Sequence, residues 1–149
     1  MSDRRPALPD VNVLVALFDP DHVHHDVAHN WFADARSQGW ATCPLTENGV
    51  IRILSNRRYT PAAEPPARTA ARLRAFCNSG DHRFWADSLS MRSHDVFADP
   101  AVYSHRTVTD LYLLALARHN GGRLATFDRT IPVAAVVGAS PDDLMVISG

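Results

Sequence analysis

Four acidic residues, spread over almost the whole chain, each stand where a short apolar segment gives way to a helix or a loop. They are Asp10, Glu47, Asp110 and Asp128. In an open α/β sheet, the working crevice lies outside the carboxyl ends of the strands, where loops from distant parts of the chain meet. The placement therefore predicts a fold that gathers the four carboxylates at one edge of a sheet.

Short apolar segments alternate along the chain with longer segments of helical periodicity. Apolar residues three and four positions apart indicate one buried helix face, and short apolar runs between turn residues indicate strands. This alternation predicts a three-layer α/β/α fold with a mostly parallel central sheet. We expect strands at residues 7–10, 40–43, 83–86, 123–127 and 144–147, and helices at 11–18, 22–36, 45–55, 66–78 and 107–119.

Length and composition predict one domain over residues 1–149, because 46% hydrophobic residues in a chain of this size suffice for a core. The net charge of −1 argues against a uniformly basic nucleic-acid binder, so any polyanion site must be local. Cys43 and Cys77 form no C-x-x-C pair, and we expect core thiols in a reducing compartment. Neither a signal peptide nor an apolar run of about 18 residues is visible, which predicts a cytoplasmic protein.

The chain contains no lysine, and all 15 of its basic side chains are arginine. A Walker-type phosphate loop and Schiff-base catalysis both need lysine, so both chemistries are excluded. The planar guanidinium group of arginine still binds phosphates well, through two parallel hydrogen bonds.

Each acid also has a purely structural explanation. Asp110 follows Thr107 by three positions, which is the spacing of a capping box at a helix start. Asp10 and Asp128 could each form a turn after a strand. Glu47 is harder to explain in this way, since it is one of only two glutamates and stands in the first turns of a helix. The joint pattern favours a site over four unrelated roles.

A cluster of carboxylates needs a cation. Two carboxylates about 5 Å apart repel by roughly 3 kcal/mol at an effective dielectric constant of about 20. Mg²⁺ or Mn²⁺ removes that repulsion, and both ions prefer oxygen ligands. Because such ions activate water and neutralise charge on phosphoryl oxygens, the expected substrate is a phosphodiester.

Short motifs around the four acids resemble those of the PIN-domain ribonucleases, and more specifically of the VapC toxins of bacterial toxin–antitoxin pairs. The resemblance extends from Leu8 to Ile147. The stretches that carry it are Leu8-Pro9-Asp10-Val11-Asn12-Val13-Leu14, Thr46-Glu47-Asn48-Gly49-Val50-Ile51-Arg52, Val108-Thr109-Asp110-Leu111-Tyr112-Leu113 and Ala125-Thr126-Phe127-Asp128.

The resemblance implies a PIN-like fold and an endoribonuclease that uses Mg²⁺ or Mn²⁺, held by Asp10, Glu47, Asp110 and Asp128. It further implies a homodimer that is silenced by a cognate VapB-type antitoxin. This chain departs from many family members after Asp128, where Arg129 and Thr130 stand in place of a second acid. We therefore expect one well-held ion, with any second ion arriving with the substrate.

Further residues are assigned supporting roles. Asn12 and Thr126, two positions from Asp10 and Asp128, are expected to orient those carboxylates, although a polar helix start and an ordinary strand threonine explain them equally well. Six arginines lie between residues 51 and 75, and a solvated helix face around Arg68 and Arg72 is the alternative to a phosphate-binding surface. Expected RNA contacts are Arg52, Arg57 and Arg58 with phosphates, and Tyr59 or Trp85, if exposed, with an unpaired base.

Three other interpretations compete. Asp10-Val11-Asn12-Val13 is similar to the nucleophile motif of haloacid-dehalogenase-like phosphatases, but that family relies on a lysine. A non-catalytic protein-binding module would use the acids structurally. Zinc is a third possibility, because His25 and His29 are four positions apart, but no cysteine or second histidine group completes a tetrahedral set.

Overall fold

Five parallel strands form the centre of the protein in the computed structural model, which describes residues 3–98 and 104–148. Their order in the sheet is β3-β2-β1-β4-β5, so the first strand of the chain lies in the middle. The strands are β1 (Ala7–Pro9), β2 (Trp40–Thr42), β3 (His82–Phe84), β4 (Arg123–Thr126) and β5 (Leu144–Val146). The predicted parallel sheet is therefore confirmed.

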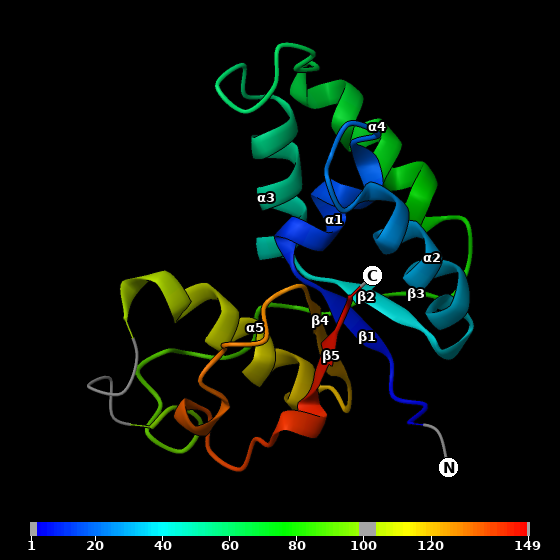
Figure 1. Cartoon of the computed structure of the whole chain (residues 1–149). Coiled ribbons are helices and arrows are strands. Elements are labelled where there is room, and N and C mark those ends of the chain that lie inside the picture. The colour runs from blue at the N-terminus through cyan, green and yellow to red at the C-terminus, as the bar shows by residue number, and fades with distance from the viewer. Residues whose placement is uncertain (1–2, 99–103, 149) are drawn as a thin grey trace.

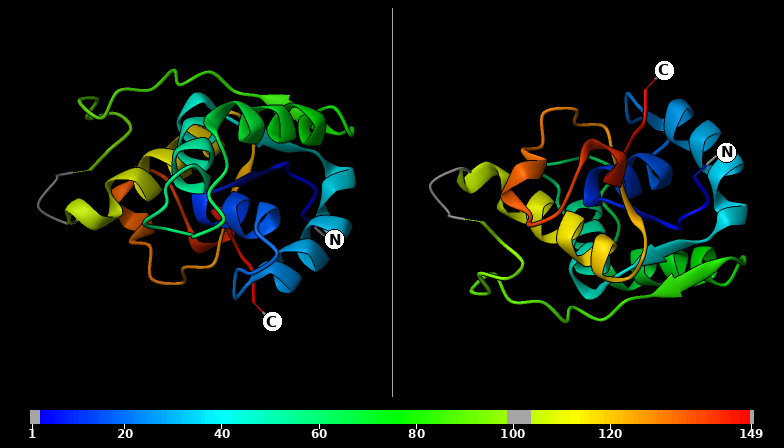
Figure 2. Two further views of the ribbon diagram at one scale, coloured as in Figure 1. Left: turned by 90° about the horizontal axis from the view of Figure 1, so that it is seen from above. Right: turned by 90° about the horizontal axis from the view of Figure 1, so that it is seen from below.

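Helices cover both faces of this sheet. They are α1 (Val11–Phe18), α2 (His25–Ala35), α3 (Pro44–Leu54), α4 (Pro66–Cys77) and α5 (Val108–His119). Alternate strand residues point to opposite faces. Ala7 and Ala125 pack in the hydrophobic core with α1 to α4, whereas their neighbours Leu8 and Leu124 pack in the core with α5. Figures 1 and 2 show α1 to α4 on one side of the sheet and α5 on the other, the expected three layers.

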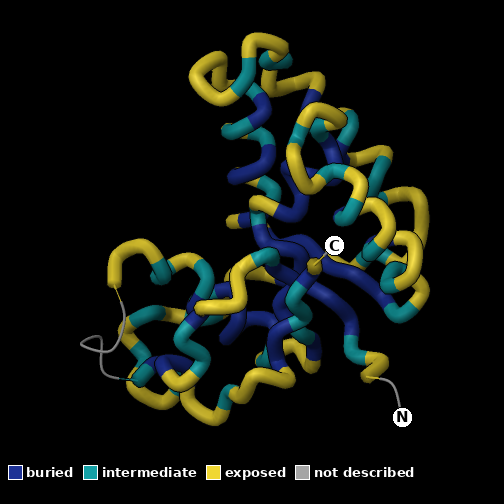
Figure 3. Tube along the Cα trace, in the orientation of Figure 1, coloured by how far each residue is buried: buried dark blue, intermediate teal, exposed yellow. Residues whose placement is uncertain are grey.

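Hydrophobic patterning decides which helices lie inside. Every residue from Val13 to Phe18 in α1 is buried, and α5 buries Leu111 and all residues from Leu113 to Ala117. Helix α4 buries only Thr69 and Leu73, since its other residues face solvent in whole or in part. Helices that are apolar on most sides lie against the sheet, while those with one apolar stripe lie outside. Figure 3 shows this as dark blue tube through β1, β2 and most of α1.

Two elements have a boundary that differs from the sequence-based prediction by two or more residues. Helix α2 begins at His25 rather than at residue 22, and His24 at its N-cap makes no side-chain capping bond. The residues before it form turns, with the Asp21 N–H donating to Asp19 Oδ1 at 3.0 Å. Strand β3 spans residues 82–84 instead of 83–86, because it pairs only with β2, residue for residue over that strand's three positions.

Both cysteines are free thiols, Cys43 buried and Cys77 half-buried, and burial raises the pKa of each. Cys43 packs in the core with α5, and Cys77 packs against the core with α1 to α4, as expected of core thiols. None of the helices in the described part of the chain is long and apolar enough to span a membrane.

Gly122, just before β4, is predicted to tolerate no side chain. A Cβ atom there would lie 2.6 Å from the carbonyl oxygen of Pro6 and 2.6 Å from the Trp85 ring. We expect Gly122→Ala to lower the free energy of unfolding by about 2–3 kcal/mol, measured by urea denaturation. Gly121→Ala is the matched control. Gly121 has φ +74°, and a Cβ atom added to it would meet nothing within 4 Å, so only backbone strain of about 1 kcal/mol is expected. Equal losses in the two variants would contradict the packing argument.

Candidate active site

Three of the four predicted acids line one pocket at the carboxyl ends of β1 and β4. These two strands are paired, with Pro9 opposite Ala125. Asp10 follows β1 directly, Asp128 lies two residues after β4, and Asp110 lies in the first turn of α5. The pocket is lined by Asp10, Asn12, Asp110, Thr126, Phe127 and Asp128. Segments far apart in the sequence thus supply one anionic pocket.

Asp10 is buried, with 5% of its surface exposed, and serves as the N-cap of α1. Its Oδ1 accepts a hydrogen bond from the Val13 N–H at 2.9 Å. Burial raises the pKa of Asp10 to about 6, the neighbouring Asp110 contributes to that rise, and hydrogen bonds from Val13 and Thr126 oppose it. The carboxylate therefore caps a helix and also carries charge that the surroundings destabilise.

Asp110 and Asp128 also line the pocket, and their pKa values are shifted in opposite directions. Burial raises the pKa of Asp110, and the charge of Asp128 adds to that rise. The Thr107 side chain makes no capping bond at the start of α5, so the proposed capping box is incomplete. Asp128 is exposed, and its Oδ1 accepts from the Thr130 hydroxyl at 2.6 Å and from the Thr130 N–H at 2.7 Å. These bonds lower the pKa of Asp128 and hold it ionised.

Thr126 connects the aspartates on the two strands. Its hydroxyl oxygen accepts a hydrogen bond from the Asp128 N–H at 3.1 Å. The Thr126 side chain also lowers the pKa of the Asp10 carboxyl group, against the larger effect of burial. The Thr126 side chain is buried, whereas Asn12 is exposed, and the role of either residue in orienting the acids stays a prediction.

Glu47 lies apart from the three aspartates, because it does not line their pocket. It stands in the first turn of α3, and its Oε2 accepts a hydrogen bond from the Thr42 hydroxyl at 2.6 Å. The Thr42 oxygen is also 2.8 Å from His82 Nε2. Since the Thr42 proton is directed to Glu47, His82 donates to Thr42. Glu47 is thus held at the end of β2, the strand next to β1.

Asp87 is a residue at this edge that the sequence analysis missed. One carboxylate oxygen accepts from the Leu45 N–H of α3 at 3.1 Å, and the other accepts from the Tyr112 hydroxyl of α5 at 3.2 Å. Asp87 therefore joins the helix that carries Glu47 to the helix that carries Asp110. No motif or spacing marks it, since it lies in an irregular segment far in sequence from both helices.

The donors available in the pocket are carboxylate, amide and hydroxyl oxygens, which are the ligand types preferred by Mg²⁺ and Mn²⁺. In their present conformations, no three His, Cys, Asp or Glu side chains within residues 3–98 and 104–148 are arranged to hold an ion. The donor chemistry fits a hard cation, and closure around it requires side-chain rotation.

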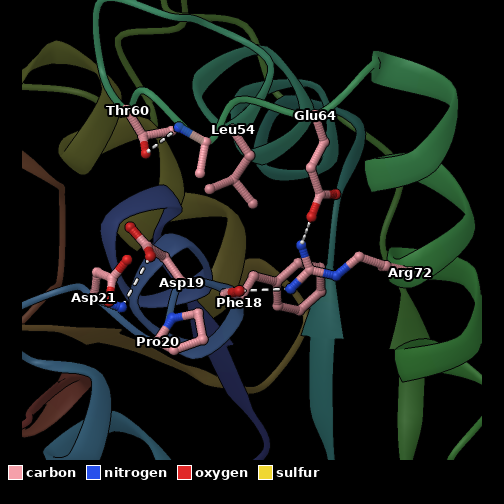
Figure 4. Close-up of a pocket in the computed structure, with 9 residues that line it drawn as sticks. Phe18, Asp19, Pro20, Asp21, Leu54, Thr60, Glu64 and Arg72 are labelled. Carbon is pink, nitrogen blue, oxygen red and sulfur yellow. Dashed lines mark hydrogen bonds and ion pairs between the residues drawn. The ribbon is translucent and has the colours of Figure 1, made fainter.

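The arginines of the predicted phosphate-binding surface fall into two groups. Arg52, Arg57 and Arg58 are exposed on α3 and the loop after it. Arg72 instead has a structural role, because it donates to Glu64 at 2.8 Å and to the carbonyl oxygen of Phe18. Figure 4 shows these contacts in a second pocket, which Asp10, Asp110 and Asp128 do not line. The Arg72 guanidinium group is already paired there.

The two aromatic residues expected to stack on RNA differ in exposure. Trp85 is only 8% exposed and packs in the core with α5, so the exposure on which its predicted stacking depends is not met. It follows β3 directly, and its backbone N–H donates to the carbonyl oxygen of Thr42. Tyr59 is 39% exposed, and its hydroxyl donates to Asp19 Oδ2 at 2.7 Å.

Proteins similar to this chain are found by sequence and by structure. The sequence model of the PIN domain family matches residues 7–137. Ribonuclease VapC39 of Mycobacterium tuberculosis is 46% identical over 132 residues, which cover 89% of this chain and 95% of the relative. Ribonuclease VapC44 of the same organism is 40% identical over 141 residues, 95% of this chain and 99% of the relative.

The fold also has a counterpart among solved structures. The crystal structure of M. tuberculosis VapC20, described as a toxin that cleaves the sarcin–ricin loop, superposes with a TM-score of 0.60. The alignment covers 91% of this chain and 99% of that one at 17% identity, so it speaks for the fold alone.

Asp10→Asn is expected to stabilise the metal-free protein at neutral pH. The pKa of Asp10 rises from an ordinary 3.8 to about 6 in the folded chain, so the folded state holds an extra proton between these values. The free energy of unfolding therefore falls as pH rises through that window. Asparagine keeps the capping oxygen and removes the charge. We expect the free energy of unfolding of the variant to exceed that of wild type by up to about 3 kcal/mol at pH 7.5 and by little at pH 4. Thermal unfolding with a chelator present measures this difference.

The matched control is Asp128→Asn, for which the opposite sign is expected. Because the folded-state pKa of Asp128 is lowered, its ionised form stabilises the fold at neutral pH. This variant should be less stable than wild type at pH 7.5, and the difference should shrink as pH falls through the range where Asp128 takes up its proton. A stability change of the same sign in both variants would refute this account of the pocket.

Proposed function

The chain belongs to the PIN-domain family, and from this membership we propose that it is a metal-dependent endoribonuclease that hydrolyses RNA phosphodiesters and acts as the toxin of a toxin–antitoxin pair. The family inferred from the sequence motifs is thereby confirmed. Relatives named as ribonucleases align over nearly the whole chain and support the reaction class. The phosphatase and the non-catalytic module are not favoured.

One observation carries the proposal, namely the convergence of Asp10, Asp110 and Asp128 on one pocket. Capping a helix or forming a turn does not require these residues to share a pocket in which burial and a neighbouring carboxylate raise the pKa values of Asp10 and Asp110. Strongly perturbed carboxylates in a cleft are typical of functional sites. In this proposal Glu47 completes the acid set from the neighbouring strand edge by turning away from Thr42.

Mg²⁺ or Mn²⁺, when bound, would activate a water molecule and neutralise charge on the phosphoryl group. Asp10, Asp110 and Asp128 would hold the ion, with Thr126 fixing the orientation of two of them. Burial of Asp10 keeps water from screening its charge, which strengthens its attraction for a cation. The RNA 2′-hydroxyl is not the nucleophile in this scheme, so no histidine or lysine base is required.

Partners follow from the same proposal. The RNA substrate places the activity in the cytoplasm, and the toxin role implies a cognate VapB-type antitoxin and a homodimer. Arg52, Arg57 and Arg58 are proposed to contact RNA phosphates, since all three are exposed on α3 and the following loop. Helix α3 carries both Glu47 and Arg52, and the loop after it carries Arg57 and Arg58.

Incubation with total RNA and Mn²⁺ tests the activity. We expect wild type to release fragments with 5′-phosphate ends, and chelation to abolish cleavage until Mn²⁺ is restored. Asp10→Asn and Asp110→Asn should each lower the cleavage rate by more than about 100-fold, beyond the tenfold to hundredfold loss typical of residues that only orient a ligand. Asp142→Asn, an exposed acid outside the pocket, is the control. Phosphate release from small monoesters without RNA cleavage would instead identify a phosphatase.

Replacement of both Arg57 and Arg58 by alanine should weaken binding of single-stranded RNA and flatten its salt dependence. Each phosphate of a single strand that the protein neutralises contributes about 0.7 to the slope of log affinity against log salt, so removing both cations should decrease the slope by up to about 1.4. Fluorescence anisotropy at several salt concentrations measures this slope. Arg92→Ala, an exposed arginine before α5, should leave it unchanged. Unaltered binding of the double variant at low salt would rule out the surface.

A further inference from the structure

The four histidines between β1 and β2 divide into two pairs with different surroundings. His25 Nδ1 lies 2.7 Å from the carbonyl oxygen of Ala16, and His29 Nε2 lies 2.9 Å from that of Leu17. Both carbonyls belong to the last turn of α1, where backbone acceptors lack partners within the helix. His25 and His29 therefore complete the end of α1, which commits them to structure and removes the pair on which a zinc site would depend.

The other pair, His22 and His24, lies against Phe127. The ring centroid of His24 is 4.7 Å from that of Phe127, and the ring of His22 is 6.4 Å away and inclined by only 23°. The two imidazole centroids are 5.8 Å apart. We call His22, His24 and Phe127 the aromatic cluster.

A hydrogen bond orients the His22 ring, and its surroundings favour the neutral form. Its Nδ1 accepts a hydrogen bond from the His24 N–H at 3.0 Å, so the ring proton resides on Nε2. Burial lowers the pKa of His22, and the neighbouring His24 and His25 lower it further against the opposing effect of Asp19. A neutral, oriented imidazole is suited to stacking and to donating one hydrogen bond.

The aromatic cluster is continuous with the anionic pocket. Phe127 lines that pocket and stands in the chain between Thr126 and Asp128. It is half-buried, while His24 is exposed and His22 partly so. An RNA strand whose phosphate lies at the aspartates therefore has aromatic surface beside it, where a neighbouring nucleotide would lie.

We propose that the aromatic cluster binds an unpaired base of the RNA, in a nucleotide adjoining the phosphate held by the carboxylates. This inference rests on the proposed function and adds a substrate subsite to it. Unpaired bases are recognised by stacking on phenylalanine and histidine rings. Such stacking tolerates any base, because every base has a π-face, so the cluster selects single-stranded RNA rather than a sequence.

The test uses an RNA oligonucleotide that spans a cleavage site mapped with the wild-type chain, and two versions of it that lack the base on one or other side of the scissile phosphate. The variants are His24→Ala, which alters an exposed side chain, and Phe127→Leu, which keeps an apolar contact with the core. His119→Ala, exposed at the opposite end of α5 from Asp110, is the matched control. Far-UV circular dichroism and melting temperature verify that each variant folds.

We expect both variants to raise KM for the intact oligonucleotide about tenfold, with a much smaller effect on kcat. On one of the two abasic oligonucleotides, wild type and variants should share the same KM, because the stacking partner is gone. His119→Ala should match wild type on all three substrates.

Two results would overturn the aromatic cluster as a base subsite. One is an unchanged KM in His24→Ala on the intact oligonucleotide. The other is a KM that the variants raise over wild type by the same factor on both abasic substrates as on the intact one, which would indicate a structural effect. Either result leaves the ribonuclease proposal standing, since wild type still cleaves. Absence of wild-type cleavage of any RNA would reject the proposed function and this inference together.

Discussion

Repulsion between carboxylates at the carboxyl ends of β1 and β4 is the constraint on which the rest of the structure depends. Two such groups about 5 Å apart repel by roughly 3 kcal/mol, and burial of Asp10 adds a desolvation penalty. The fold tolerates this because Asp10 accepts a hydrogen bond from the Val13 N–H, while Asp128 accepts two hydrogen bonds from Thr130. A pocket kept in this state supports the proposal that it binds a cation.

The first turns of three helices offset part of the repulsion between these carboxylates. Asp10 caps α1, Glu47 stands in the first turn of α3, and Asp110 stands in the first turn of α5. The positive end of a helix dipole stabilises a carboxylate in each of these positions. The same helix ends also favour the approach of a phosphate group. The structural explanation for each acid and the functional one are therefore compatible. The position of Asp10 at the start of α1 makes it a cap and also offsets part of the free energy lost by burying its charge.

Sequence reasoning succeeds for elements in which local and long-range forces agree. Helices α1, α3 and α5 are predictable because their apolar residues recur at helical spacing and each begins near an acid or a proline. It fails where a tertiary contact decides the outcome. Trp85 has the sequence context of a surface aromatic on a strand, yet its ring fills the core beside Gly122. Asp87 has no recognisable signal, because its two partners lie 42 and 25 residues away in the chain.

The sequence by itself determined the alternation of elements, the parallel character of the sheet, the family, and the acids at the strand ends, because periodicity and turn chemistry are local properties. Only the tertiary structure decided that Asp10, Asp110 and Asp128 share a pocket while Glu47 is turned toward Thr42. It alone separated His25 and His29, which complete α1, from His22 and His24, which lie against Phe127. The physical reason is that side-chain direction at a sheet edge depends on which neighbouring donor reaches each group, and those donors come from segments that no sequence spacing connects.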